Sequence, residues 1–211
     1  MSRLIDISVP LHPGLPVWPG NPKVQLEFTM RMADGHHANV SRMALNVHSG
    51  THIDAPLHFI HEAKTTAEIA LEKFCGPCQV VSFEGQKAIT ADGLEALQLP
   101  DGVSRLLFKT DNSKKWDDPS HPFDTTYCAL TADAAQWVVD HGIVLVGIDY
   151  LSIQLFHDPP DTHVILLRKE VVILETLDLR GVAPGPYELL CLPISARGVE
   201  GIPARAVLKT L

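Results

Sequence analysis

Short runs of β-branched and apolar residues recur along the whole chain, and this recurrence is the feature that most constrains its fold. Two of the runs, 23–32 and 40–47, alternate apolar and polar residues in the manner of half-buried strands. The remaining runs have the length of ordinary strands and are bounded by Gly, Pro or polar residues. The predicted strands are 4–9, 23–32, 40–47, 80–83, 105–109, 144–148, 171–176, 188–192 and 206–211.

Helix signals are fewer and lie between the predicted strands. The candidates are 66–74, 90–97 and 131–141, and the last has Thr131 and Asp133 at its start and Gly142 just past its end. The 211 residues are enough to bury one substantial core. We therefore expect an α/β fold with a sheet or barrel-like core and flanking helices, in a single domain over residues 1–211.

Charge and hydropathy exclude several classes of partner. Lys and Arg total 17 against 25 Asp and Glu, a net charge of −8, whereas a nucleic-acid-binding surface is basic. No apolar window approaches the ~18 residues of a membrane span, and the N-terminus has no signal-peptide pattern. We expect a cytoplasmic protein that binds neither nucleic acid nor membranes.

Two of the four cysteines stand in a Cys75-Gly76-Pro77-Cys78 frame. Thioredoxin-like redox chemistry needs the first cysteine at a helix N-terminus, where its pKa is lowered. Here a predicted helix precedes the frame and a predicted strand follows it, so Gly76-Pro77 is predicted to be the turn between them. A redox role is the less favoured alternative, and it requires that alkylation of Cys75 abolish function.

Histidines are concentrated in one part of the chain. Six of the 11 lie between residues 36 and 61, and three of these, with one aspartate, fall in the segment from His48 to Phe59. Gly50 and Pro56 disfavour a helix, so we expect a loop that leaves the strand 40–47. The other three, which we expect at the surface or behind the site, are His36, His37 and His61.

The residue types in this segment indicate a metal site. In a loop, His48, His52 and Asp54 can turn toward one point, and two imidazoles with a carboxylate suit zinc, manganese or iron better than calcium. The two oxygens of Asp54 can bridge two ions. His58 can stand apart from the ions as a general acid or base.

One segment cannot saturate two ions, so more distant ligands are expected. His163 and Glu175 are polar residues at the edges of apolar runs, where an unpaired charge would be costly to bury. We therefore predict both as ligands. His157 beside Asp158, and His121, are weaker alternatives in proline-rich surroundings.

The sequence resembles the cyclase-like metal hydrolases that include bacterial kynurenine formamidases. Their hallmark, His-x-Gly-Thr-His-x-Asp-x-Pro-x-His, matches residues 48–58 at every fixed position. The resemblance covers nearly the whole chain, from Trp18-Pro19-Gly20 through Val146-Gly147-Ile148-Asp149 to 187–194 and 203–208.

This resemblance implies a swivelling β/β/α fold, a homodimer and a pair of divalent metal ions, most often Zn²⁺, with Mn²⁺ as the alternative. It implies hydrolysis of N-formyl-kynurenine to kynurenine and formate in tryptophan catabolism. By position, it assigns Trp18 to the substrate pocket and His58 to proton transfer. The implied metal ligands are His48, His52, a bridging Asp54, His163 and Glu175.

Two segments depart from the formamidase pattern. Tyr150-Leu151-Ser152-Ile153 replaces a Thr-Pro-Ser-like segment, and Arg168-Lys169-Glu170 is a more charged turn than is typical. Neither change touches a predicted ligand, so hydrolysis is retained as the prediction and the substrate is left open. The alternatives are a cyclic amide, imide, isatin-like compound or lactone as substrate, and an inactive metal- or small-molecule-binding protein.

Overall fold

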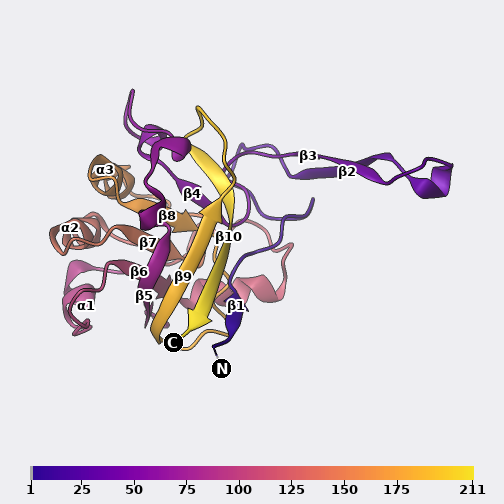
Figure 1. The fold of residues 1–211 in the computed structure, drawn as a ribbon. Coiled ribbons are helices and arrows are strands. Elements are labelled where there is room, and N and C mark those ends of the chain that lie inside the picture. The colour runs from indigo at the N-terminus through magenta and orange to yellow at the C-terminus, as the bar shows by residue number, and fades with distance from the viewer. Residues whose placement is uncertain (1) are drawn as a thin grey trace.

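A computed structural model describes residues 2–211, and its main feature is a β-barrel of seven strands (Figure 1). Each strand pairs with the next around the barrel, and the last pairs with the first, which closes it. The strands in this spatial order are β10 (Gly201–Thr210), β4 (His52–Asp54), β8 (Val172–Glu175), β7 (Leu145–Ile148), β6 (Arg105–Lys109), β5 (Cys75–Ser82) and β9 (Gly185–Pro193).

The barrel is mixed in strand direction. Strands β5, β6, β7 and β8 run parallel to their neighbours within that group, and the other pairings are antiparallel. Strands β7 and β8 are buried along their whole length, as expected for parallel strands covered on both faces. A short strand, β1 (Leu4–Asp6), pairs with the far half of β10. The expected α/β class with a barrel-like core is confirmed.

Helices cover one side of the barrel (Figure 1). They are α1 (Ala91–Glu95), α2 (Ala132–Asp140) and α3 (Asp161–Arg168), and α2 packs against α3. One apolar cluster fills the space between helices and barrel and includes Val138, Ile148 and Leu166. A second cluster, with Leu107 and Leu174, brings together inward residues of the barrel strands. The barrel therefore has a packed interior, which leaves its rims as the places where a cavity can form.

Two positions show how tightly the strand β7 is held. A Cβ on Gly147 would lie 2.5 Å from Leu107 Cδ2, so no larger residue fits there without displacing its neighbours. Just past β7, Asp149 is buried and accepts hydrogen bonds from the backbone and hydroxyl groups of Thr110 and Ser113. This carboxylate fixes the 3₁₀ helix η5 (Asp111–Asp117) to the end of β7.

The helix predictions have mixed outcomes. Helices α1 and α2 confirm the candidates 90–97 and 131–141, and Gly142 follows α2 with φ +69°. The predicted helix 66–74 is wrong. Two 3₁₀ turns, η3 (Thr66–Glu68) and η4 (Leu71–Lys73), replace it, because Ile69 and Ala70 between them are extended. Thr65 and Glu68 form a capping box, but the helix that it begins is only the single turn η3.

Strands β2 (Gln25–Met30) and β3 (Val40–Ala44) form a separate antiparallel arm with the 3₁₀ turn η1 (Met32–Asp34) at its tip. Figure 1 shows this arm extending well away from the barrel. Both strands were predicted, but the prediction that they are half-buried is wrong. Every residue of β2 is exposed, because nothing in the described chain covers the arm. The apolar alternation therefore belongs to a surface of the molecule.

The predicted turn at Gly76-Pro77 is also wrong. Strand β5 begins at Cys75 and runs through both residues, pairing with β9. Gly76 has φ +133°, and the Arg105 guanidinium packs where a side chain at 76 would lie. Burial raises the pKa of the Cys78 thiol to about 12, the reverse of what a redox cysteine requires. The frame is therefore a strand segment and offers no helix N-terminus to Cys75.

Among residues 2–211, no helix combines the length and the apolar character needed to cross a membrane.

Candidate metal centre

The centre is built on β4, the shortest strand of the barrel. His52 and Asp54 are two residues apart, so their side chains lie on the same face of the strand. His52 pairs in register with Glu175 of β8, and Asp54 pairs with Gly201 of β10. The expected loop is therefore wrong for residues 52–54, which form a buried strand, whereas His48 lies in the turn that precedes it. The 3₁₀ helix η2 (Pro56–His58) follows and carries His58.

The structure brings the five predicted ligands together at one rim of the barrel. His48 Nδ1 lies 2.9 Å from Asp54 Oδ1, and His52 Nε2 lies 3.5 Å from the same oxygen. His52 Nε2 is also 3.3 Å from Glu175 Oε2. His163 Nε2 lies 3.4 Å from Glu175 Oε1 and 3.9 Å from Asp54 Oδ2. Each carboxylate thus directs one oxygen toward His52 and the other toward His163.

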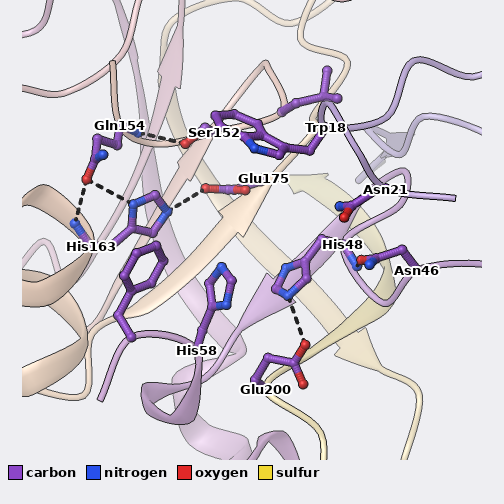
Figure 2. Close-up of a pocket in the computed structure, with 12 residues that line it drawn as sticks. Trp18, Asn21, Asn46, His48, His58, Ser152, Gln154, His163, Glu175 and Glu200 are labelled. Atoms are coloured by element: carbon purple, nitrogen blue, oxygen red, sulfur yellow. Dashed lines mark hydrogen bonds and ion pairs between the residues drawn. The ribbon is translucent and has the colours of Figure 1, made fainter. Parts of the chain in front are cut away.

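His163 reaches the centre from helix α3, which is not among the helices predicted from the sequence. Gln154 accepts hydrogen bonds through Oε1 from the His163 backbone (3.4 Å) and from its Nδ1 (3.2 Å) (Figure 2). Glu175 accepts a 2.7 Å hydrogen bond from the Ile153 backbone. The segment 153–154 therefore fixes both distant ligands at once.

The orienting hydrogen bonds leave defined nitrogen atoms free. His52 Nδ1 donates to the Gly50 carbonyl at 2.8 Å, and His163 Nδ1 donates to Gln154, so both rings direct Nε2 inward. A neutral imidazole has one donor and one acceptor nitrogen, and metal-binding histidines are commonly fixed in this way through the other ring N–H. These two rings are held as ligands need to be.

Unpartnered buried atoms test whether a cation fits. Among the described residues, His52 Nε2 and Asp54 Oδ2 are buried and have no hydrogen-bond partner. Tetrahedral ligands at zinc distances lie about 3.3 Å from one another, close to several separations found here. Imidazole and carboxylate donors suit zinc and manganese. His52, Asp54 and Glu175, and separately His48, Asp54 and His58, have potential ligand atoms within 4.8 Å of one another. The residues fit a divalent cation.

Electrostatics of the centre also favour a cation. Burial opposes protonation of His48, but the carboxylates of Asp54, Glu175 and Glu200 outweigh it and raise its pKa to about 9. Burial likewise opposes ionisation of Asp54, yet the neighbouring histidines hold its pKa well below the usual range. Without a metal ion the cluster therefore retains a proton on His48. A cation competes with that proton, since a ligating histidine must give it up.

His58 lies beside the cluster. Its ring stacks on His48 with centroids 4.1 Å apart, and it lines the cavity next to the centre. Burial and the charge of His48 lower the pKa of His58 below its ordinary 6.5, against the opposing effect of Asp54. His58 is therefore neutral near pH 7 and able to accept a proton. Its proximity to His48 and Asp54 also permits it to act as a ligand.

A cavity of about 360 Å³ opens onto the centre (Figure 2). Trp18, Phe59 and Leu151 supply an apolar wall. Trp18 packs against Phe123 and Phe156 with ring centroids 5.2 and 5.3 Å away. The polar lining includes residues that the sequence interpretation missed: Asn21, Asn46, Ser152, Gln154 and Glu200.

The other histidines lie outside this centre. His36 and His37 are exposed near the tip of the arm, and the side chain of His61 is 93% exposed. His157 is exposed, and His121 lies in a different cavity beside Lys115 and Asp124.

The chain belongs to the cyclase family: the family model described as "Putative cyclase" matches residues 5–154. Cyclase-like protein 1 of Arabidopsis thaliana is 39% identical over 216 residues, covering 98% of this chain and 85% of the relative. Kynurenine formamidase of Bacillus cereus is 32% identical over 211 residues, covering 100% of this chain and 99% of the relative. The expected family membership is confirmed.

Solved structures agree with this assignment. A protein described as a predicted metal-dependent hydrolase from Bacillus stearothermophilus superposes with a TM-score of 0.85 at 32% identity, covering 100% of both chains. An isatin hydrolase bound to the product analogue thioisatinate superposes with a TM-score of 0.87 at 22% identity. The match covers 99% of this chain and 92% of the isatin hydrolase, and it shows the same fold.

Proposed function

We propose that this protein is a metal-dependent hydrolase that cleaves a carbon–nitrogen amide bond in a small aromatic substrate, with arylformamidase-type activity. One observation carries the proposal. Five potential ligands gather at one centre, and three of them line a single cavity together with a neutral histidine and an aromatic wall. The hydrolase names of the relatives, kynurenine formamidase among them, support the same reaction class.

Two divalent cations, Zn²⁺ or Mn²⁺, suit the donor atoms. His52, Asp54 and Glu175 would hold one ion, because their donor atoms lie within 4.8 Å of one another, and His48 would hold the other together with Asp54. His163, 3.4 Å from Glu175 Oε1 and 3.9 Å from Asp54 Oδ2, would complete the set of ligands. Bound there, the cations would supply Lewis-acid activation of water and of the substrate carbonyl.

His58 and Trp18 supply what the ligands do not. His58 takes a proton from the attacking water, because its lowered pKa keeps it neutral, and passes that proton to the leaving nitrogen. Protonation makes an aniline-type nitrogen easier to expel. Trp18 stacks on the aryl ring of the substrate, which orients the amide toward the centre.

N-formyl-kynurenine is the first candidate substrate, with kynurenine and formate as products. A specific observation favours a second candidate, an uncharged cyclic amide or isatin-like compound. None of the twelve described residues that line the cavity is Lys or Arg, whereas the carboxylate of an amino-acid substrate is commonly paired with such a cation. The Glu200 carboxylate at the rim repels the carboxylate of such a substrate and suits only its α-ammonium group.

An assay of the purified protein before and after chelation tests the proposal. N-formyl-kynurenine, isatin and a cyclic imide are offered in parallel, and Zn²⁺ or Mn²⁺ is restored to the chelated sample. We expect hydrolysis that is lost on chelation and recovered with metal. Metal binding without hydrolysis of any of the three would favour an inactive metal-binding protein. Loss of function on alkylation of Cys75, with no effect of chelation, would favour the redox alternative.

We also propose that the protein is a homodimer joined through the arm of β2 and β3. Leu26 pairs directly with Met43, and Phe28 lies on the same face as Leu26, so this face is apolar. Their exposed fractions are 44%, 51% and 52%. The other face carries the ion pair of Glu27 and Arg42. A two-stranded hairpin is marginally stable alone, and an exposed apolar face marks a protein contact.

The occupant is a second copy of this chain, because the barrel offers a complementary surface. A groove of about 420 Å³ is lined by Pro10 and Leu11 and by Leu192 and Ile194, which are 58% and 53% exposed. Light scattering of the purified protein is expected to give twice the chain mass, and Phe28→Glu is expected to give the monomer. Gln25→Glu adds the same charge on the opposite face as the control. A wild-type monomer would refute the proposal.

A further inference from the structure

His48 is oriented differently from the other two histidines of the centre. His52 and His163 have Nδ1 in a hydrogen bond and direct Nε2 inward. His48 instead directs Nδ1 toward Asp54 Oδ1, at 2.9 Å. Its Nε2 lies 3.4 Å from Glu200 Oε1, and Figure 2 shows the Glu200 side chain reaching this ring.

Glu200 is the only carboxylate on the Nε2 side of His48 among the described ion-pair contacts. A carboxylate that accepts the outer N–H of a ligating histidine fixes its tautomer and increases the basicity of the other nitrogen. The Glu200 side chain is 39% exposed, so it extends from solvent to the buried ring. Unlike the hydrogen bonds that Gly50 and Gln154 accept, this 3.4 Å contact is an ion pair, and His48 Nε2 has no hydrogen-bond partner among the described residues. Glu200 is therefore the carboxylate placed to accept a hydrogen bond from this nitrogen.

Gly201 provides the surface on which the His48 ring rests. A Cβ at position 201 would lie 2.5 Å from His48 Cε1, 2.9 Å from Nδ1 and 3.0 Å from Nε2. A real Cβ does not occur at such distances, so the ring reaches its place only because residue 201 has no side chain. Ring atoms on both sides of Cε1 contact this one position, which restricts both the tilt and the depth of the ring.

The backbone ties these two residues to the ligands. Gly201 pairs with Asp54 between β10 and β4, and the Glu200 carbonyl accepts a 2.8 Å hydrogen bond from the Ala55 backbone. The first residue of β10 and the residue before it are thus held in place by the segment that carries Asp54. A displacement at 200–201 would move His48 relative to Asp54, the pair that a shared ion requires.

We propose that Glu200 and Gly201 are positioning residues of the metal centre. When an ion takes Nδ1 of His48, Glu200 closes on the ring and accepts its Nε2–H, and Gly201 admits the ring, so that His48 offers Nδ1 while His52 and His163 offer Nε2. This inference rests on the proposed function, because it requires that the centre bind a metal.

Metal affinity is the measurement that tests this role. Zn²⁺ is titrated against a chromophoric chelator, and the visible spectrum of the Co²⁺-loaded protein reports ligand geometry independently of activity. Glu200→Ala removes the acceptor and is expected to weaken binding of one ion by about 10- to 100-fold and to change the Co²⁺ spectrum. Glu200→Gln keeps an acceptor oxygen and is expected to restore most of the affinity. Gly201→Ala is expected to reproduce the loss through steric displacement of His48.

Glu72→Ala, at an exposed glutamate of η4, is the matched control and is expected to bind like the wild type. Far-UV circular dichroism checks that each variant is folded, and Glu200→Ala keeps the test valid if Gly201→Ala does not fold. A folded Glu200→Ala protein with wild-type affinity and an unchanged Co²⁺ spectrum would overturn the proposal and leave the hydrolase proposal standing. Failure of the wild type to bind metal would instead overturn both.

Discussion

Replacing His58 with glutamine separates the two roles that its position allows. The ring lines the cavity and stacks on His48, yet it also lies within ligand distance of a potential ion shared with His48 and Asp54. Glutamine fills a similar volume and cannot carry a proton at neutral pH. A proton carrier and a ligand are then distinguished by whether activity or metal content is lost.

The magnitude follows from the proton-transfer role. Loss of a positioned general base costs about 10²- to 10⁴-fold in kcat, or about 2.7–5.4 kcal/mol of transition-state stabilisation. Metal content is expected to be unchanged, because the two carboxylates and three other histidines of the centre remain. The assay combines initial rates on a formanilide with metal analysis of the same preparation after gel filtration.

The pH profile gives an independent check. Burial lowers the pKa of His58 below 6.5, and so does the positive charge beside it, whether that is the proton on His48 or a cation that replaces it. The neutral ring that accepts a proton therefore predominates above that pKa. The wild-type rate is expected to fall as the pH drops through the pKa of His58. The His58→Gln variant is expected to lose this decrease and to keep any that arises from the carboxylates or the metal. His61→Gln, at an exposed histidine, is the control. A kcat within threefold of the wild type, or metal content that falls in step with activity, would refute the proton-transfer role.

Three further outcomes follow from contacts described above. Trp18→Ala is expected to raise KM for an aryl amide about 2- to 13-fold, from the ~0.5–1.5 kcal/mol of an aromatic pair, with Trp18→Phe closer to the wild type in the same steady-state assay. Gly147→Ala is expected to lower the free energy of unfolding in urea by about 1–3 kcal/mol, because its Cβ would overlap Leu107; an unchanged midpoint would contradict this packing. Asp149→Asn sets an amide against donors from Thr110 and Ser113 and is expected to cost about 1–3 kcal/mol for each donor left unpaired, measured by the same titration.

The barrel strands could be predicted because burial on both faces leaves a local record in the sequence. Residues 105–109, 144–148 and 171–176 each contain an apolar run, and each contains a strand of the barrel. The arm shows the limit of this reasoning. Alternation at 23–32 indicates one apolar face, but it does not say whether that face meets the chain's own core or the outside.

Residues of the site that lie close together in the sequence could be predicted, whereas those that only the fold brings together were harder to find. His48, His52 and Asp54 lie within seven residues, and their types and spacing indicate a cation. Glu175 could be found because a carboxylate ends a buried run. Glu200 could not, since its partnership with His48 arises only from the pairing of β10 with β4. An exposed glutamate before a strand has no local feature that indicates this role.

The place of β4 in the barrel has a consequence for the order of folding. Within residues 2–211, its three residues pair with β8 and β10 alone, partners about 120 and 150 positions later in the chain. Contacts this distant form late, because the closure entropy of the intervening chain must be overcome first. During synthesis, His52 and Asp54 therefore remain without their strand partners until almost the whole chain has left the ribosome. A ribosome-bound chain that stops short of residue 201 lacks β10 and is expected to capture no metal, so cation uptake can serve as a signal that the barrel has closed.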